Sequence, residues 1–183
     1  MAPSASVPRR RRSPLNLYTL ETLVAAINAA PQDWRPLVLT NGCFDLIHAG
    51  HVRYLGAARA LGKRLVVGLN SDRSVAALKP KRPIIPEGQR AEVLASLRSV
   101  DAVVLFSDRT ATTLIEVLQP EIYVKGGDYQ LETLPEAAAV QRYGGRIEFI
   151  QVEVPSSTTA IVQRILELHG EESPGAWSPQ NQP

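Results

Sequence analysis

Apolar residues along this chain fall into five short runs, and stretches with helical spacing lie between them. Short apolar runs bounded by polar residues are typical of strands buried in a parallel sheet, whereas apolar positions three and four residues apart indicate amphipathic helices. The predicted strands are Leu37–Leu39, Leu65–Leu69, Ala102–Phe106, Ile122–Val124 and Ile147–Ile150. The predicted helices span Leu17–Ala30, Val52–Leu61, Arg90–Leu97, Thr112–Leu118, Leu134–Tyr143 and Thr159–Leu168. This alternation predicts an α/β fold, with a single three-layer domain built on a five-stranded parallel sheet.

Polar residues follow each predicted strand. The segments are Asn41–His51, Asn70–Asp72, Ser107–Asp108, Lys125–Asp128 and Ser156–Thr159. Ligands of open parallel sheets bind outside the carboxyl ends of the strands, near the point where the strand order reverses. We therefore expect these segments to meet at one edge of the sheet and to form one site there.

The segment Asn41–His51 places two histidines three residues apart at a strand-to-helix junction. A helix that begins near Gly50 leaves backbone N–H groups free and carries a partial positive charge at its start, so it stabilises an anion. Gly42 and Gly50 lack side chains where a phosphate would approach the backbone. His48 and His51, about one turn apart, can both point at that phosphate.

Two other roles for this segment stay open. His48, His51 and Cys43 can be metal ligands, but zinc sites need four ligands or three plus water, and the remaining histidine, His169, is distant in sequence. Cys43 can be a nucleophile paired with a histidine, although a single cysteine beside a strand is more often a small buried apolar residue. We expect no metal held by protein side chains.

Three further groups of polar residues have both a chemical and a structural interpretation. Lys79, Lys81 and Arg82 lie in a proline-rich stretch that predicts a loop, either solvated or closing over a substrate. Lys125 ends a strand before Gly126 and Gly127, which suits a phosphate approaching the backbone. Asp128 can accept hydrogen bonds from ribose hydroxyls or cap a turn. The run Ser157, Thr158 and Thr159 predicts a helix cap, and the same geometry binds anions.

Composition and charge narrow the possible functions. The chain has 183 residues, of which 44% are hydrophobic and 21% charged, as in an ordinary globular domain. Without Arg9–Arg12 it holds 16 basic and 18 acidic residues, so nucleic acid is not an expected partner. No stretch approaches the roughly 20 apolar residues of a membrane span, and a single cysteine fits the reducing cytoplasm. Neither a G-x-G-x-x-G fingerprint nor a P-loop occurs.

Residues 1–16 and 171–183 are predicted to be disordered tails, the first basic and the second rich in Pro, Ser, Gln and Asn. The domain is expected to span residues 17–170. Four adjacent arginines in such a tail are usually solvated, so the basic pI of 8.8 describes the tail rather than the domain.

With these motifs in view, the chain resembles the nucleotidyltransferase superfamily marked by H-x-G-H and a later S-T-T. Within it, the chain is most similar to the adenylyltransferase domain of the bifunctional heptose kinase/adenylyltransferase. The resemblance runs from about Arg35 to Leu168 and rests on motifs in the correct order. They are Thr40–Leu55, Val67–Asp72, Arg82–Ile84, Arg90–Leu97, Val124–Tyr129 and Ser157–Thr159.

The resemblance implies a Rossmann-like fold and transfer of the adenylyl group of ATP to D-glycero-β-D-manno-heptose 1-phosphate. His48, His51 and Lys79 would be catalytic, and Asp45, Arg82 and Arg90 are candidates for contact with the acceptor phosphate. The implied nucleotide-binding residues are Gly42, Cys43, Phe44, Gly50, Lys125, Gly127, Asp128, Ser157, Thr158 and Thr159. Mg²⁺ would arrive with ATP and have few protein ligands.

The resemblance also implies a homodimer, with a separate sugar kinase and phosphatase supplying the acceptor. Two alternatives stay open: a cytidylyltransferase acting on glycerol 3-phosphate or a related phosphate, and a nucleotide-binding module without turnover. The Asn70–Asp72 and Gly126–Tyr129 segments favour the heptose type over the first. The retention of both histidines, the lysines and the S-T-T run argues against the second.

Overall fold

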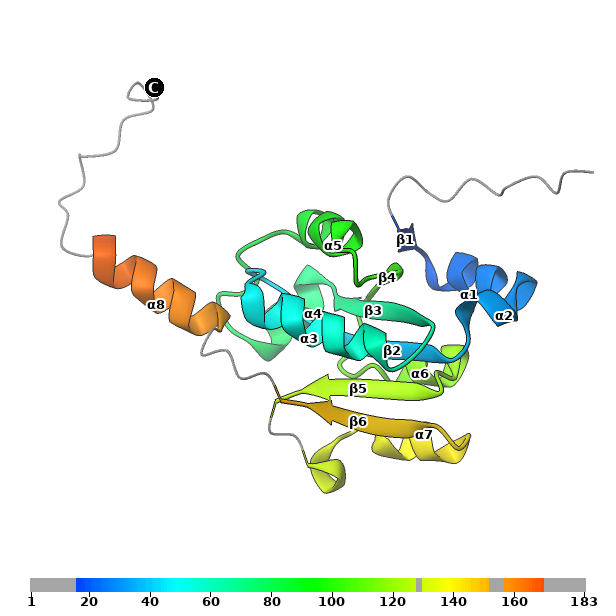
Figure 1. Ribbon diagram of the computed structural model, residues 1–183. Helices are drawn as coiled ribbons and strands as arrows, with labels where there is room; N and C mark the ends of the chain where they lie inside the picture. The colour runs from blue at the N-terminus through cyan, green and yellow to red at the C-terminus, as the bar shows by residue number, and fades with distance from the viewer. Residues whose placement is uncertain (1–15, 128–129, 152–156, 170–183) are drawn as a thin grey trace, which may run out of the picture.

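The computed structural model describes residues 16–127, 130–151 and 157–169. The predicted tails, apart from Asn16, lie outside the described residues, and so does Asp128. Figure 1 shows a twisted sheet with helices packed on its faces. None of the described helices is both long enough and apolar enough to cross a bilayer.

The sheet has six parallel strands in the order β1-β4-β3-β2-β5-β6. The strands are β1 (Leu17–Tyr18), β2 (Leu37–Gly42), β3 (Arg64–Asn70), β4 (Ala102–Phe106), β5 (Ile122–Gly126) and β6 (Arg146–Ile150). The α-helices are α1 (Leu20–Ala29), α2 (Pro31–Trp34), α3 (Ala49–Ala60), α4 (Asp72–Leu78), α5 (Glu87–Ser96), α6 (Thr112–Leu118), α7 (Ala137–Arg142) and α8 (Thr158–His169), and a short 3-10 helix spans Leu131–Thr133. The predicted α/β class, the parallel sheet and all five predicted strands are confirmed.

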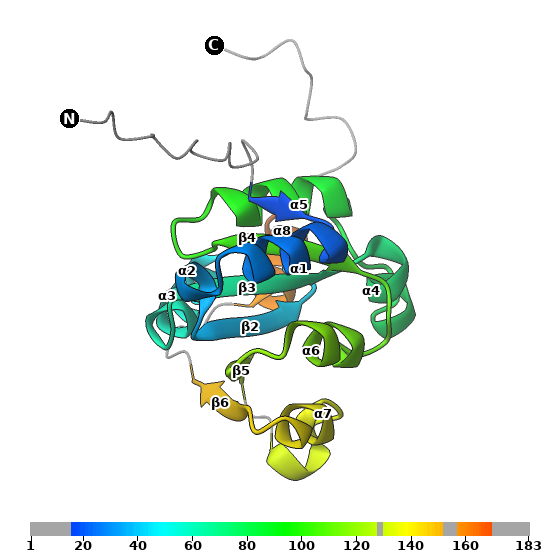
Figure 2. The same ribbon diagram turned by 90° about the vertical axis from the view of Figure 1, so that its right-hand side faces the viewer.

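Alternate residues of each strand point to opposite faces, so the sheet divides the core in two. Leu37 and Leu39 pack with α1, α6 and α7 on one face. Val38 packs with α3 and α5 on the other. Figure 2 shows α3 on one side of the sheet and α6 and α7 on the opposite side. This is the three-layer arrangement that the alternation of elements predicts.

The count of five strands is wrong, because β1 adds a sixth at the edge. Leu17 and Tyr18 pair with Val103 and Val104 of β4, and the predicted helix over Leu17–Ala30 starts only at Leu20, after the Thr19 cap. Asn16 extends this pairing, since its carbonyl accepts the Val103 N–H at 2.8 Å. Two short helices, α2 and α4, were also not predicted. Such short elements carry too few apolar positions to show a period.

The strand order reverses between β2 and β5. The chain leaves β2 toward α3 on one face, whereas it leaves β5 toward α7 on the other. The two connections therefore diverge, and sheets of this kind bind their ligands in the crevice expected at such a divergence, outside the carboxyl ends of the strands.

Candidate active site at the carboxyl edge of the sheet

The connection from β2 to α3 carries the two histidines to the crevice. Phe44 adopts a left-handed backbone with φ of 45°, which turns the chain at the end of β2. Gly42 allows this turn, because a Cβ there would lie 3.0 Å from Phe44 Cε2. His48 is the N-cap of α3 but its side chain makes no capping hydrogen bond. The first N–H groups of α3 are thus left for an anion.

His48 and His51 stack on one another with ring centroids 3.9 Å apart and planes at 27°. Phe44 packs against His51, and the centroids of these two rings are 5.3 Å apart. Nδ1 of each histidine is buried and has no hydrogen-bond partner among the described residues. Burial, together with the charge of His48, lowers the pKa of His51 to about 4. Burial also lowers the pKa of His48, so both rings are neutral at pH 7.

Lys125 reaches the crevice from the far side of the sheet. Its Nζ donates to Asn41 Oδ1 at 2.8 Å, and the same oxygen accepts the Tyr123 hydroxyl at 2.6 Å. Glu136 Oε1, at the start of α7, lies 3.9 Å from Lys125 Nζ and accepts the Ala111 N–H. Burial lowers the pKa of Lys125, and the charge of Glu136 opposes this shift. Sequence reasoning found Lys125 but missed Asn41 and Glu136, which orient it.

Tyr54 fastens α3 to the two strands that border the crevice. Its hydroxyl lies 2.6 Å from Thr40 Oγ1 of β2 and donates to the carbonyl of Val124 in β5 at 3.1 Å. Gly126 permits this packing, since a Cβ there would lie 2.9 Å from Tyr54 Cε2. Gly127 has φ of 100°, a conformation that favours glycine. Gly126 and Gly127 therefore have different structural reasons to be glycine.

The proline-rich stretch from Lys79 to Pro86 forms a loop, as predicted. Asp45 anchors its second half, accepting Arg82 Nη1 at 2.7 Å and the N–H groups of Ile84 and Ile85 at 2.9 Å. These bonds lower the pKa of Asp45 against the effect of burial. Lys79, in contrast, is exposed. Within the described part of the chain its ammonium has no ion-pair partner, so its charge is uncompensated.

Arg90 lies deeper than the other basic residues, with 1% of its surface exposed. Its guanidinium donates to the carbonyls of Ile85, Cys43 and Asn70 at 2.8, 2.5 and 2.9 Å and to Asp72 Oδ1 at 2.7 Å. The structure thus places Arg90 beneath the site, with four of its five N–H donors bonded to the protein itself.

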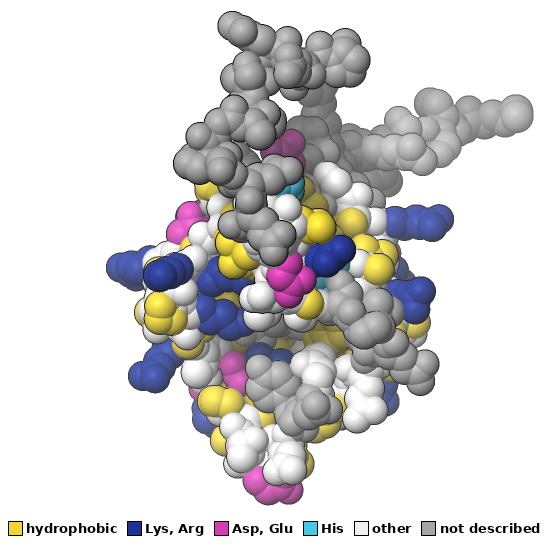
Figure 3. Space-filling view, turned by 90° about the vertical axis from the view of Figure 1, so that its left-hand side faces the viewer, with side chains coloured by type: hydrophobic (Ala, Val, Ile, Leu, Met, Phe, Trp, Pro, Cys, Tyr) yellow, Lys and Arg dark blue, Asp and Glu magenta, His cyan; other side chains and the backbone are white. Residues whose placement is uncertain are grey.

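The remaining predicted groups lie around the same edge. Ser107 Oγ donates to Ser71 Oγ at 3.0 Å, which joins the ends of β3 and β4. Ser157 Oγ accepts the Ala160 N–H at 3.0 Å and so caps α8, as predicted. Figures 1 and 2 place α8 beyond the carboxyl edge of the sheet. Figure 3 looks onto this edge and shows Lys and Arg side chains gathered there, with histidine visible beside one of them.

The two other roles considered for His48, His51 and Cys43 find little support in this geometry. Among residues 16–127, 130–151 and 157–169, no group of three His, Cys, Asp or Glu side chains could hold a metal ion. Burial raises the pKa of the Cys43 thiol, against the opposing charges of Lys79 and Arg90. The thiol is therefore protonated at pH 7 and poorly suited to act as a nucleophile.

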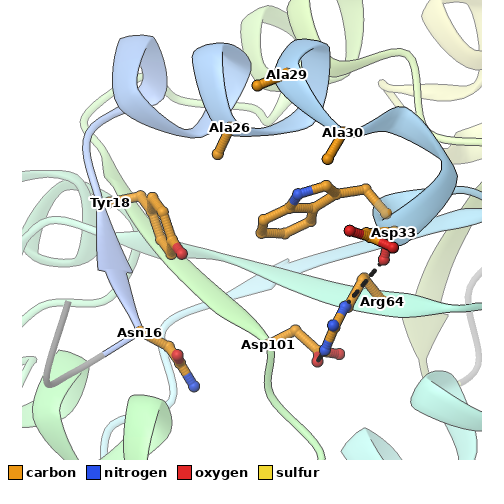
Figure 4. Close-up of a pocket in the computed structure, with 9 residues that line it drawn as sticks. Asn16, Tyr18, Ala26, Ala29, Ala30, Asp33, Arg64 and Asp101 are labelled. Atoms are coloured by element: carbon orange, nitrogen blue, oxygen red, sulfur yellow. Dashed lines mark hydrogen bonds and ion pairs between the residues drawn. The ribbon is translucent and has the colours of Figure 1, made fainter. Parts of the chain in front are cut away.

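A separate pocket of about 300 Å³ lies at the opposite, amino edge of the sheet (Figure 4). Tyr18 and Trp34 line it in an edge-to-face contact at 6.1 Å. Arg64 borders it, donating to the carbonyl of Asp33 at 3.1 Å and pairing with Asp101 at 2.5 Å. None of the predicted site residues lines this pocket. We place the functional site at the carboxyl edge, where the histidines, the free helix start and the lysines meet.

Comparison with known proteins identifies the family of this chain. A model of the cytidylyltransferase-like family matches residues 39–172. The bifunctional protein HldE of Geobacter sulfurreducens is 47% identical over 154 residues, which cover 84% of this chain and 31% of that protein. The protein of the same name from Magnetococcus marinus is 55% identical over 130 residues, covering 70% of this chain and 27% of that protein. The chain thus spans about a third of the length of these curated relatives.

A solved structure supports the same assignment. The lipopolysaccharide core biosynthesis protein from Thermoplasma volcanium superposes with a TM-score of 0.54 at 26% identity, covering 65% of this chain and 97% of that one. The family match includes both histidines, Lys125 and the S-T-T run. By its sequence and by its fold, the chain belongs to the cytidylyltransferase-like family of nucleotidyltransferases.

Proposed function

We propose that this protein transfers the adenylyl group of ATP to a sugar 1-phosphate, D-glycero-β-D-manno-heptose 1-phosphate, giving ADP-heptose and pyrophosphate. The observation that carries the proposal is the stacked pair of His48 and His51 at the uncapped start of α3. This pair lies at the reversal point of the sheet, where a phosphate chain fits. The similarity to HldE proteins supports adenylyl transfer and the heptose acceptor.

The chemistry requires charge stabilisation rather than a protein nucleophile. An oxygen of the acceptor phosphate forms a bond to the α-phosphorus of ATP, while the bond from that phosphorus to the bridging oxygen breaks and pyrophosphate leaves. Positioning the two substrates in line and neutralising the charge on the phosphate oxygens are the main tasks. Neutral imidazoles, a helix start and lysine ammonium groups supply donors for both tasks.

We propose the following roles for the site residues. His48 and His51 would hold the triphosphate and stabilise the transition state, and the backbone from Gly42 to Gly50 would lie along it. Lys125 would contact a phosphate from the β5 side, held in place by Asn41 and Glu136. The N–H groups at Ser157, Thr158 and Thr159 would bind phosphate oxygens, and Gly127 with Asp128 would contact the nucleoside.

Lys79 is the cation that we assign to the reacting phosphates from the loop, because its positive charge acts on both His51 and Cys43 of the site. Arg82 would face the acceptor while remaining paired with Asp45. The oxygens of Asp45 already accept three donors, so this carboxylate is poorly placed to bind Mg²⁺. The metal ion would enter as part of the ATP substrate.

The upstream enzymes, the compartment and the oligomeric state are also proposals. A heptose 1-phosphate would come from a sugar kinase and a phosphatase that act upstream. The single cysteine is consistent with a location in the reducing cytoplasm. The resemblance of the chain to its superfamily favours a homodimer.

Pyrophosphate release with Mg²⁺ tests the proposal, with ATP or CTP crossed against the heptose 1-phosphate and glycerol 3-phosphate. Release with ATP and the heptose phosphate alone is the expected result. Release with CTP would make the protein a cytidylyltransferase. Binding of ATP without release in any combination would favour a nucleotide-binding module. The His48→Ala variant is the matched control, since it should bind the acceptor but release little pyrophosphate.

A further inference from the structure

Arg90 joins three chain segments that border the candidate active site. It donates to Cys43 O just after β2, to Asn70 O at the end of β3 and to Ile85 O in the Lys79–Pro86 loop. Its ion pair with Asp72 also connects it to the start of α4. The Asp72 N–H in turn donates to Glu87 Oε2 of α5 at 2.6 Å. One planar guanidinium with five fixed donors can hold several acceptors in set directions, which a lysine ammonium cannot do.

Asp45 binds the same part of the Lys79–Pro86 loop as Arg90 does. Its carboxylate accepts the N–H groups of Ile84 and Ile85 and the guanidinium of Arg82. Asp45 lies between Cys43, which Arg90 holds, and His48, which begins α3. The Ile84–Ile85 backbone is therefore held through the Ile85 carbonyl by Arg90 and through both N–H groups by Asp45.

The two ends of the Lys79–Pro86 loop differ in how they are held. From Arg82 onward the loop is tied to Asp45 and Arg90. At the other end, Lys79 is the C-cap of α4: its N–H donates to the carbonyl of Val75, and its carbonyl accepts the Arg82 N–H. Lys79 is thus held on one side by α4 and on the other by the Arg82 N–H, through which a shift of the anchored end would reach it.

We propose that Arg90 and Asp45 are positioning residues, which set the distance between the Lys79–Arg82 arm of the loop and the His48–His51 pair. This inference rests on the proposed nucleotidyl transfer for its effect on turnover. It replaces the expectation that Arg90 and Asp45 contact the acceptor phosphate, because their polar atoms are engaged inside the protein. A misplacement of about 1 Å at a reacting centre lowers turnover by about 10²-fold.

Hydrogen exchange tests the positioning role without any substrate. In Arg90→Lys and in Asp45→Asn, the amides of Ile84 and Ile85 should exchange at least about tenfold faster than in the native protein. The amides of Val104 and Leu105 in β4 serve as the internal reference and should not change. Arg98→Lys, at an exposed arginine of the turn after α5, is the matched control. Equal acceleration at all these amides, or none at Ile84 and Ile85, would overturn the positioning role.

Steady-state kinetics then tests the link to turnover. Arg90→Lys should lower kcat by about 10- to 100-fold and leave the KM for ATP within about threefold. A higher KM for the acceptor at unchanged kcat would show direct contact with the acceptor and contradict the inference. Faster exchange at Ile84 and Ile85 with native kinetic constants would contradict it as well. Native protein that is inactive with every substrate pair would refute the proposed function, while the exchange result still decides the positioning role.

Discussion

Tyr54→Phe is the substitution whose cost can be worked most directly from the structure. The Tyr54 hydroxyl pairs with Thr40 Oγ1 and donates to Val124 O, at 2.6 and 3.1 Å. Thr40 has no exposed surface and Tyr54 only 7%, so water cannot easily replace either bond. A buried hydrogen bond contributes about 1 kcal/mol, and a buried group left unpaired costs about 1–3 kcal/mol.

The expected loss is therefore about 2–3 kcal/mol in the free energy of unfolding, measured by urea denaturation. For a chain of this size it corresponds to a fall in Tm of about 5–10 °C. Because Tyr54 fastens the histidine-bearing helix to β2 and β5, turnover should fall too. Tyr18→Phe is the control: the Tyr18 hydroxyl has no hydrogen-bond partner among the described residues, so its loss should change stability by less than about 0.5 kcal/mol.

A double-mutant cycle isolates the Thr40–Tyr54 pair. When both partners become apolar, as in Thr40→Val with Tyr54→Phe, no hydroxyl of the pair is left unsatisfied, and the double variant should be more stable than the sum of the single losses by about 1 kcal/mol. Additive losses, or a Tyr54→Phe protein as stable as the Tyr18→Phe control, would refute the reasoning that this hydroxyl holds α3.

Three further predictions concern the site itself. His48→Ala or His51→Ala should lower kcat about 10²-fold or more, as loss of a charge-stabilising donor does; a folded double variant with normal pyrophosphate release would show that the pair is not needed. His51 stays neutral in the fold down to its pKa of about 4, whereas in the unfolded chain it binds a proton below about 6.5. The unfolded state thus binds more protons between these values, so the free energy of unfolding should fall as the pH drops from 6.5 to 4, and less in His51→Gln; equal pH slopes in urea melts would contradict this. Lys125→Ala should raise the KM for ATP or for the acceptor, and unchanged constants for both would remove Lys125 from the binding site.

The sequence predicts the parallel sheet because its buried strands are apolar runs, and such runs can be recognised without knowledge of the tertiary contacts. The edge strand β1 escapes prediction, since Leu17 and Tyr18 are only two residues and pair with β4, which is distant in sequence. The positions of the polar segments follow from the same logic. Parallel strands bring their carboxyl ends to one edge, so Ser71 and Ser107 meet there.

The sequence could not predict which charged residues support the structure and which are exposed at the site. Sequence shows that Asp45, Arg82 and Arg90 are charged but not which of them reach solvent. The structure distinguishes them, since Arg90 is buried on backbone carbonyls, whereas Lys79 is exposed and has no ion-pair partner among the described residues. Asn41 and Glu136 were missed for the same reason. Their contact with Lys125 joins β2 and α7 to β5, and no local pattern records it.

Transfer of a radiolabel from ATP tests the central claim most directly. With ATP labelled on the α-phosphate and D-glycero-β-D-manno-heptose 1-phosphate as acceptor, the label should appear in ADP-heptose, while label on the γ-phosphate should appear in pyrophosphate. Label from the γ-phosphate on the sugar would instead show a kinase reaction. If neither label leaves ATP while ATP still binds, the site at the carboxyl edge binds nucleotide without catalysing the transfer, and the account is contradicted.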